Sequence, residues 1–195
     1  LLHLRSGDTL NCLVERIDDL GVWIKSTQST AKYIPHAKIK VLELRQDIAS
    51  AKIDKTKTER LLTLPRMQRD NPPQQLIRSL DGDYLRGRLV AMDDKELQVE
   101  VRLDTRTIER TQVARIIWLH ADDMPEATPN AAAAVKEPEN PLPPGVRVQT
   151  VARDDRRLTF FAQRLQGPSL LGTSEVLGDC RAALDEINML LIGRE

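Results

Sequence analysis

Two segments of this chain, residues 4–44 and residues 78–119, resemble each other, and this internal similarity constrains the fold more than any other feature. Gly7-Asp8 of the first segment aligns with Gly82-Asp83 of the second, and the aliphatic positions that follow align as well. A one-residue slip then aligns Val41, Leu42 and Leu44 with Ile116, Ile117 and Leu119. Self-similarity of this kind indicates a repeated supersecondary unit. Because the shared positions are turn formers and apolar residues, the similarity predicts an architecture and does not identify a reaction.

Apolar and polar residues alternate between the turns of both segments, a pattern typical of half-buried β-strands. Each segment has room for five short antiparallel strands. We expect them to form a strongly bent sheet or small barrel, because such a sheet hides its own edges. Gly87 lies between Leu85 and Leu89 in mid-strand, which indicates a sharp bend or bulge. The predicted fold class is all-β, with tandem small five-stranded barrels.

Composition divides the chain into a first barrel unit (1–45), a connector (46–75), a second barrel unit (76–120), a linker (121–145) and a third β-rich segment (146–195). The connector contains Asp54–Leu62, compatible with one or two helical turns, so we expect a short helical and extended strap. The linker is rich in Pro, Ala and acidic residues and is expected to be extended. The last segment is interpreted as a worn third copy. In it, Asp154-Asp155 takes the place of the Gly-Asp turn, and Leu184–Ile192 is a closing strand or a helical turn.

The charge balance argues against a polyanion as partner. Basic and acidic residues number 29 each, so the net charge is zero, whereas nucleic-acid-binding domains usually carry a basic excess or a basic face. No apolar run reaches the length of a membrane-spanning helix, and no signal peptide is visible. The chain begins at Leu1 without a methionine, so we expect it to be a segment of a longer protein.

The two cysteines, Cys12 and Cys180, give no redox motif because no CxxC is present. Cys12 aligns with Gly87, so no paired cysteine framework is written into the similar segments. Two buried or half-buried thiols are the expected state, and a disulfide between them remains open.

Residues 81–101, DGDYLRGRLVAMDDKELQVEV, resemble the first half of an Sm-like barrel domain. The resemblance implies a five-stranded, strongly bent barrel. It also implies that RNA would be gripped by an Asn in the turn after the acidic residue and by an Arg-Gly pair near the last strands. Here the turn is Asp93-Asp94-Lys95-Glu96, and the last strands read RTQVARI at Arg110–Ile116. The fold is therefore expected to carry over, and the RNA site is not.

A second resemblance rests on LLTLPRMQRDNPP (61–73), GDYLRGRL, RIIWLH and RLTFFAQRLQGPSLLGTSEVLGDC (157–180). These segments are similar to the region that precedes the thioredoxin-like (redoxin) domain in some large bacterial proteins. This implies a non-catalytic barrel array upstream of a redox domain and is compatible with a cell-envelope or secreted location. None of the redox residues lies in this chain, so none is carried over.

Carboxylate pairs occur at Asp18-Asp19 and Asp93-Asp94. Paired carboxylates can perform acid/base chemistry. Adjacent Asp residues in a hairpin turn more often bond the local backbone, and their recurrence at aligned places favours this interpretation. His120-Ala121-Asp122-Asp123 is a weak metal motif at the end of a strand, and a solvated strand end is favoured. His3 and His36 are isolated in the sequence.

Five arginines are the best candidates for binding an anion such as a phosphate or a carboxylate: Arg66, Arg69, Arg78, Arg86 and Arg88. A salt-bridged face is the favoured alternative, because Asp70, Asp81 and Asp83 lie within a few residues of them.

No catalytic triad order, phosphate-binding loop or GxGxxG motif is present, so we expect no catalytic residue, no cofactor and no metal. The leading hypothesis is a non-catalytic structural or protein-interaction module, whose partners are other domains of the parent protein or another protein. RNA binding by Sm-like barrels is one alternative. An accessory, substrate-holding role beside a thiol-disulfide oxidoreductase is the other.

Overall fold

The computed structural model describes residues 1–45, 72–102, 104–120 and 144–193, and 64% of these are in strands and 4% are helical. The all-β fold class is confirmed, with curled antiparallel sheets. We call residues 1–45, 72–120 and 144–193 the first, second and third units. The predicted helical strap at Asp54–Leu62 lies outside the described residues, as does the linker up to residue 143.

The first unit contains β1 (Leu2–Leu4), β2 (Thr9–Leu10), β3 (Leu13–Ile17), β4 (Gly21–Lys25), β5 (Tyr33–Pro35), the 3-10 turn η1 (His36–Lys38) and β6 (Ile39–Glu43). The second unit contains β7 (Gln75–Ser79), β8 (Tyr84–Met92), β9 (Glu96–Val101), β10 (Asp104–Glu109), the 3-10 turn η3 (Arg110–Gln112) and β11 (Val113–Trp118). The third unit contains β12 (Val146–Ala152), β13 (Arg157–Gln166), β14 (Ser169–Ser174), β15 (Gly178–Ala183) and β16 (Ile187–Ile192). The helical-turn alternative for the closing segment is wrong from residue 187 onward, because that part is a strand.

All three units have one strand order. The last strand pairs with the first, the first with the second, the second with the third, and the third with the fourth, which gives β15-β14-β13-β12-β16 in the third unit. The second strand is a single bent strand in β8 and β13 and is split into β2 and β3 in the first unit. The first half of β8 and of β13 pairs with the first strand of its unit, and the second half pairs with the third strand.

Close backbone approach explains the mid-strand glycine. A Cβ on Gly87 would lie 2.5 Å from Val99 Cγ1 and 2.9 Å from the Glu100 carbonyl oxygen, so only glycine lets β9 come this near. A bulge follows three residues later, between Leu89 and Ala91. The predicted bend and bulge are therefore both present.

The turn between the first two strands sets which residues are equivalent. The amides of Gly7, Gly82 and Asp155 donate to the carbonyl three residues earlier, and all three residues have positive φ. Asp155 thus takes the glycine place and Arg156 the aspartate place. The sequence alignment of Asp154-Asp155 with Gly-Asp was wrong by one residue.

The first two units are joined by strand pairing at two places. β6 pairs with β11 antiparallel, with Leu42 opposite Ile116, and β3 meets β8 where Ile17 lies opposite Met92. Leu42 and Ile116 are equivalent, because they lie opposite Leu2 on β1 and Ile77 on β7, which are equivalent first-strand positions. Ile17 and Met92 are equivalent by the sequence alignment.

Each contact therefore pairs a residue of the first unit with the equivalent residue of the second unit. Pairing of this kind is characteristic of an isologous interface about a local two-fold axis. We call this arrangement the two-fold junction. The register also corrects the sequence alignment: Leu42 matches Ile116, not Ile117, so the one-residue slip proposed near the end of the segments does not exist.

Two polar clamps cross the junction. His36 Nε2 donates to the Asp18 carbonyl oxygen at 2.7 Å while its Nδ1 accepts from the Trp118 indole at 3.1 Å, which fixes the neutral ring with hydrogen on Nε2. At the equivalent position, Arg110 donates to the Asp93 carbonyl at 2.9 Å and to the Val14 carbonyl at 3.0 Å. Each 3-10 turn thus holds a turn of its own unit and reaches into the other.

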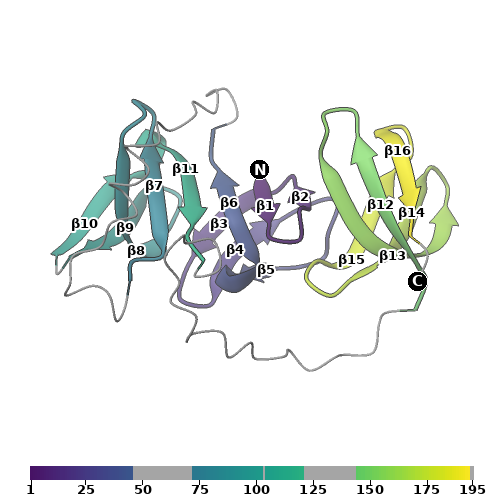
Figure 1. Ribbon diagram of the computed structural model, residues 1–195, viewed down its shortest axis with the longest axis horizontal. Helices are drawn as coiled ribbons and strands as arrows, with labels where there is room; N and C mark the ends of the chain where they lie inside the picture. The colour runs from purple at the N-terminus through teal and green to yellow at the C-terminus, as the bar shows by residue number, and fades with distance from the viewer. Residues whose placement is uncertain (46–71, 103, 121–143, 194–195) are drawn as a thin grey trace, which may run out of the picture.

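The third unit docks on the first, which lies in the middle of the molecule (Figure 1). Residues 28–31 run beside the edge of β15, where Thr30 N–H donates to the Asp179 carbonyl at 3.0 Å and Arg181 N–H donates to the Gln28 carbonyl at 2.9 Å. The buried carboxylate of Asp8 accepts from the Thr159 amide at 2.8 Å. One apolar cluster runs through all three units, from Leu2 to Ile116 and Phe160. A unit of this size buries too little surface alone, so sharing one core stabilises all three.

We predict that Gly87→Ala lowers the free energy of unfolding by about 1–3 kcal/mol, because the added methyl group forces β8 and β9 apart. Chemical denaturation measures the change. Gly193→Ala is the matched control, since the atom nearest to a Cβ there, the Arg147 carbonyl oxygen, lies 3.5 Å away. Equal stabilities of the two variants would contradict the close-approach explanation.

We predict that Asp8→Ala costs about 1–3 kcal/mol, because it leaves the Thr159 amide without its acceptor between two units. Asp83→Ala, the same change at the exposed equivalent position, should cost less than about 0.5 kcal/mol. Urea denaturation compares them, and faster exchange of the Thr159 amide in Asp8→Ala alone would locate the effect. Similar losses in both variants would rule out a docking role for Asp8.

Candidate functional site

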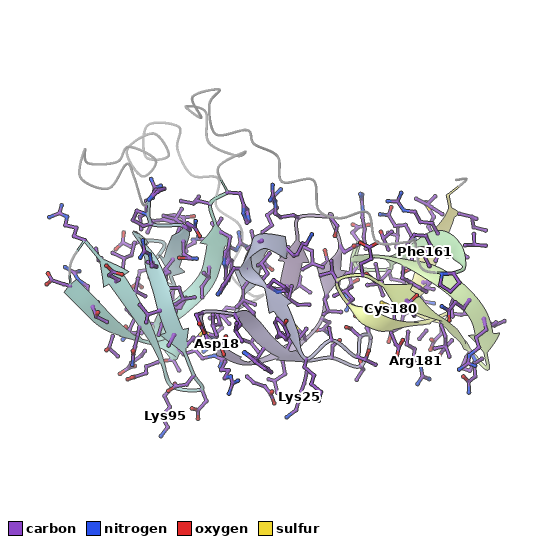
Figure 2. The ribbon with its side chains drawn as sticks, turned by 90° about the horizontal axis from the view of Figure 1, so that it is seen from below. Asp18, Lys25, Lys95, Phe161, Cys180 and Arg181 are labelled. Carbon is purple, nitrogen blue, oxygen red and sulfur yellow. The ribbon has the colours of Figure 1, made fainter. Side chains whose placement is uncertain are left out.

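The repeated carboxylates act on their own turns. Asp18 Oδ1 accepts from the Leu20 and Gly21 amides at 3.0 and 3.3 Å, and Asp93 Oδ1 accepts from the Lys95 and Glu96 amides at 2.7 and 2.9 Å. Backbone amides satisfy these carboxylates, as expected for turn formers. Figure 2 shows Asp18 between the labelled Lys95 of the second unit and Lys25 of the first.

Hydrogen bonding lowers the pKa of both carboxyl groups. At Asp18, partial desolvation raises the pKa, but the Trp23 indole, the two turn amides and the Arg16 guanidinium together outweigh it, so the net shift is downward. At Asp93, the amides of Glu96 and Lys95 are the largest causes of the lowered pKa. Both groups are therefore anions at neutral pH, and neither is suited to act as a general acid there.

The structure describes three of the five arginine candidates, and each of them contacts groups of the second unit. Arg66 and Arg69 lie outside the described residues. Arg78 is buried on β7 with its guanidinium 5.9 Å from the centre of the Tyr84 ring. Arg86 Nε donates to the Pro73 carbonyl at 3.2 Å, and Arg88 lies 3.8 Å from the Glu100 carboxylate. Anion binding by these five residues remains a prediction.

The histidines bind backbone atoms and neighbouring side chains. His120 Nε2 contacts the Ile39 carbonyl oxygen at 2.6 Å, while Asp122 and Asp123 of the same motif lie outside the described residues. His3 lies 3.6 Å from Glu43. Among the described residues, no cluster of three His, Cys, Asp or Glu side chains could hold a metal ion.

Both cysteines are thiols in the structure. Burial, followed by the nearby carboxylates of Asp8 and Asp179, raises the pKa of Cys180 to about 12. Burial also raises the pKa of Cys12. Since the thiolate is the reactive form, neither cysteine is placed for thiol chemistry. Figure 2 shows Cys180 within the sheet of the third unit.

A groove of about 610 Å³ opens between the first and third units. The first unit supplies two aromatic rings, two cations and small or apolar side chains, and the third unit supplies an acid and a valine: Trp23, Thr30, Ala31, Lys32, Tyr33, Pro35, Lys38, Glu175 and Val176. A groove of this size between two units is a usual place for a ligand or a peptide.

The aromatic pair in the groove is held rigidly. Trp23 and Tyr33 lie opposite each other on β4 and β5, and their ring centres are 5.3 Å apart. The Trp23 indole N–H donates to Asp18 Oδ2 at 2.6 Å, and the Arg16 guanidinium lies 4.3 Å from its ring centre. The protein satisfies the indole N–H, and both rings line the groove, so the pair offers a preorganised contact surface.

The sequence analysis did not find this aromatic pair, although a signal was available. Gln98 and Thr107 lie opposite each other at the equivalent positions of the second unit. Aromatic residues in one copy where the other has polar residues indicate a surface that one copy uses and the other does not.

Comparisons of the chain with protein-family models, with curated proteins and with solved structures find no match. No helix among the described residues is long and apolar enough to cross a membrane. The site is therefore interpreted from its own geometry, which is a rigid aromatic floor with lysines nearby.

We predict that the stability contributed by Asp18 is present at neutral pH and is lost in acid. Its folded pKa lies below the ordinary value of 3.8, so the contribution is complete above that value and disappears as the pH falls through the folded pKa. Asp18→Asn should therefore lower Tm at about pH 7 and have a smaller effect at about pH 3. Asp19→Asn changes the exposed neighbouring carboxylate and is the control. Equal shifts for both variants at neutral pH would contradict a specific role for Asp18.

Proposed function

We propose that this chain is a non-catalytic protein-interaction module of a larger protein, and that it binds an extended segment of a protein partner in the groove between its first and third units. The observation that carries the proposal is the rigid pair of Trp23 and Tyr33 in that groove. Tyr and Trp are enriched at the energetic centres of protein interfaces, because they offer large contact areas at low entropic cost.

The lining of the groove indicates the chemistry of the partner. Ala31, Pro35 and Val176 add apolar surface beside the aromatic rings, and Lys32 and Lys38 outnumber the single acid Glu175. A segment with proline or aliphatic residues and one or more acidic side chains fits such a surface, since extended proline-containing peptides bind aromatic-lined grooves.

An Sm-like barrel architecture for the units is part of this proposal. It is supported by the strand order shared by the three units and by the bend of the second strand at Gly87. All three units contribute to one apolar core, which holds them together. A groove formed by two units keeps its shape only if the units do not move apart, so the shared core supports a scaffold role.

We predict that a labelled peptide of about 12 residues, acidic and containing proline, binds the 195-residue chain and that the double variant Trp23→Gln/Tyr33→Thr weakens binding at least about tenfold. The replacement residues are those at the equivalent positions of the second unit, so the fold should tolerate them. Fluorescence polarisation against an array of such peptides measures the effect.

The control for this experiment is Gln98→Ala, at the position in the second unit equivalent to Trp23. It should leave peptide affinity unchanged. The proposal fails if no peptide of the array binds, or if binding survives in the Trp23→Gln/Tyr33→Thr variant.

RNA binding is the second candidate, and the same aromatic pair is the observation in its favour, because aromatic rings beside cations can stack single-stranded bases. The zero net charge and the presence of Glu175 in the groove favour a peptide. A titration with a short RNA at low and moderate salt separates the two, since RNA affinity falls steeply with salt.

An accessory role beside a redoxin domain of the parent protein is the third candidate. Within it, the chain would hold a protein substrate in the groove, and the thiol chemistry would lie elsewhere, because burial raises the pKa of both cysteines. Comparing the activity of the parent's redox domain with and without this region tests that role.

A further inference from the structure

The third unit exposes an apolar strand at the edge of its sheet. β16 pairs only with β12 among the described strands, and its last four residues, Met189, Leu190, Leu191 and Ile192, are all exposed. Both faces of the strand are apolar, and exposed surface of this kind marks an interaction site or an aggregation hazard. Figure 1 shows β16 at the end of the molecule away from the second unit.

The other open edges lack this character. β2 has two residues, β5 has three and ends in Pro35, and β10 carries mostly polar residues (DTRTIE). Short length, proline and charge are the ordinary means by which proteins prevent unwanted pairing of strand edges. The edge of β15 is covered by residues 28–31. Among the described edges, β16 alone is long, apolar and open.

The exposed residues of β16 are equivalent to residues of the two-fold junction. Leu190 lies opposite Thr150 on β12, just as Leu42 lies opposite Leu2 on β1. Thr150 and Leu2 are equivalent positions of the first strand in their units. Leu190 is therefore the counterpart of Leu42 and Ile116, which are fully buried where they meet each other, whereas Leu190 is 42% exposed.

The second contact of the junction is exposed in the third unit as well. Leu165 lies two residues beyond the β13 bulge, as Ile17 lies two residues beyond the β3 bulge. Ile17 and its counterpart Met92 are each 2% exposed, whereas Leu165 is 63% exposed. Apart from Val146, the exposed large apolar residues in the described part of the third unit lie on these two junction elements or on the turn before β16: Leu165, Leu184, Met189, Leu190, Leu191 and Ile192.

The polar clamps of the junction have apolar counterparts in the third unit. Leu184 takes the place of His36, three residues before the closing strand's first paired position, and Ile192 takes the place of Leu44 and Trp118. The contact between His36 and Trp118 would become a contact between two exposed aliphatic side chains. An apolar version of the junction is thus present on the third unit, and no other described strand pairs with it.

We propose that two copies of this chain associate through their third units, by the same isologous pairing that joins the first and second units within one chain. Strand β16 of one copy pairs antiparallel with β16 of the other, with Leu190 opposite Leu190 and Met189 opposite Leu191. The two Leu165 side chains meet at the second contact. A second copy is the fitting occupant, because the internal junction already shows that this surface is self-complementary.

The backbone of β16 is prepared for this pairing. The Gly193 amide donates to the Arg147 carbonyl on β12. Because amides alternate in direction along a strand, those of Leu190 and Ile192 point to the open side. Leu42 has the same orientation, since its neighbour Glu43 donates to Leu1 on the side of β1.

Sedimentation or light scattering of the 195-residue chain tests the proposal, and the expected result is a mass of two chains. In Leu190→Lys, the two-fold axis places two ammonium groups opposite each other, which should raise the dissociation constant at least about tenfold. Leu190→Glu should do the same. A mixture of the two variants should regain the dimer, because the charges are then opposite.

Leu80→Lys is the matched control. Leu80 is 41% exposed, and the equivalent turn positions in the other units hold Arg5 and Arg153, so the fold tolerates a cation there. This variant should remain dimeric. Leu165→Lys should weaken the dimer through the second contact.

Three results would overturn the proposal. One is a wild-type chain that remains monomeric at about 100 μM, a concentration at which even weak specific pairs form. Another is a dimer that survives in both Leu190→Lys and Leu165→Lys, which would place the interface elsewhere. The third is a failure of mixed Leu190→Lys and Leu190→Glu chains to associate while circular dichroism shows both variants folded.

Discussion

The structure depends on strand pairing at the two-fold junction. Leu42 lies opposite Ile116 between β6 and β11, and Ile17 lies opposite Met92 between β3 and β8. Each unit therefore pairs its strand with the equivalent strand of the other unit. A small curled sheet leaves edges that can pair with anything extended, and mutual pairing removes that hazard while merging two small cores into one. The clamps made by His36 and Arg110 then fix the angle between the units.

This constraint has consequences for the third unit. With two units satisfied by each other, the third docks through a different edge, β15, and through the Asp8 carboxylate. That docking creates the groove with Trp23 and Tyr33 and leaves the junction surface of the third unit exposed. The described residues thus present two distinct surfaces: a groove that two units build together, and an exposed apolar edge, β16, that pairs with no second strand among them.

The sequence predicted the features that depend on local chemistry. The Gly7 and Gly82 turns, the Asp18 and Asp93 turn carboxylates and the bend at Gly87 follow from residue types whose backbone preferences act over a few positions. The sequence did not predict which strand of one unit meets which strand of another, because β6 and β11 are both apolar and pairing partners far apart leave no local pattern. The register of β11 was misaligned by one residue for this reason. Ile116 and Ile117 are both aliphatic, so an alignment shifted by one residue still matches apolar residues with apolar residues.

The groove was missed for a different reason, since its aromatic residues lie ten positions apart and become neighbours only when β4 and β5 pair. The most direct test is native-state hydrogen exchange on the amides of Leu42 and Ile116, two residues that lie opposite each other across the two-fold junction. If that junction makes the first two units one cooperative body, both amides exchange with one opening free energy, equal to that of global unfolding. Two different opening free energies, one for each unit, would contradict it.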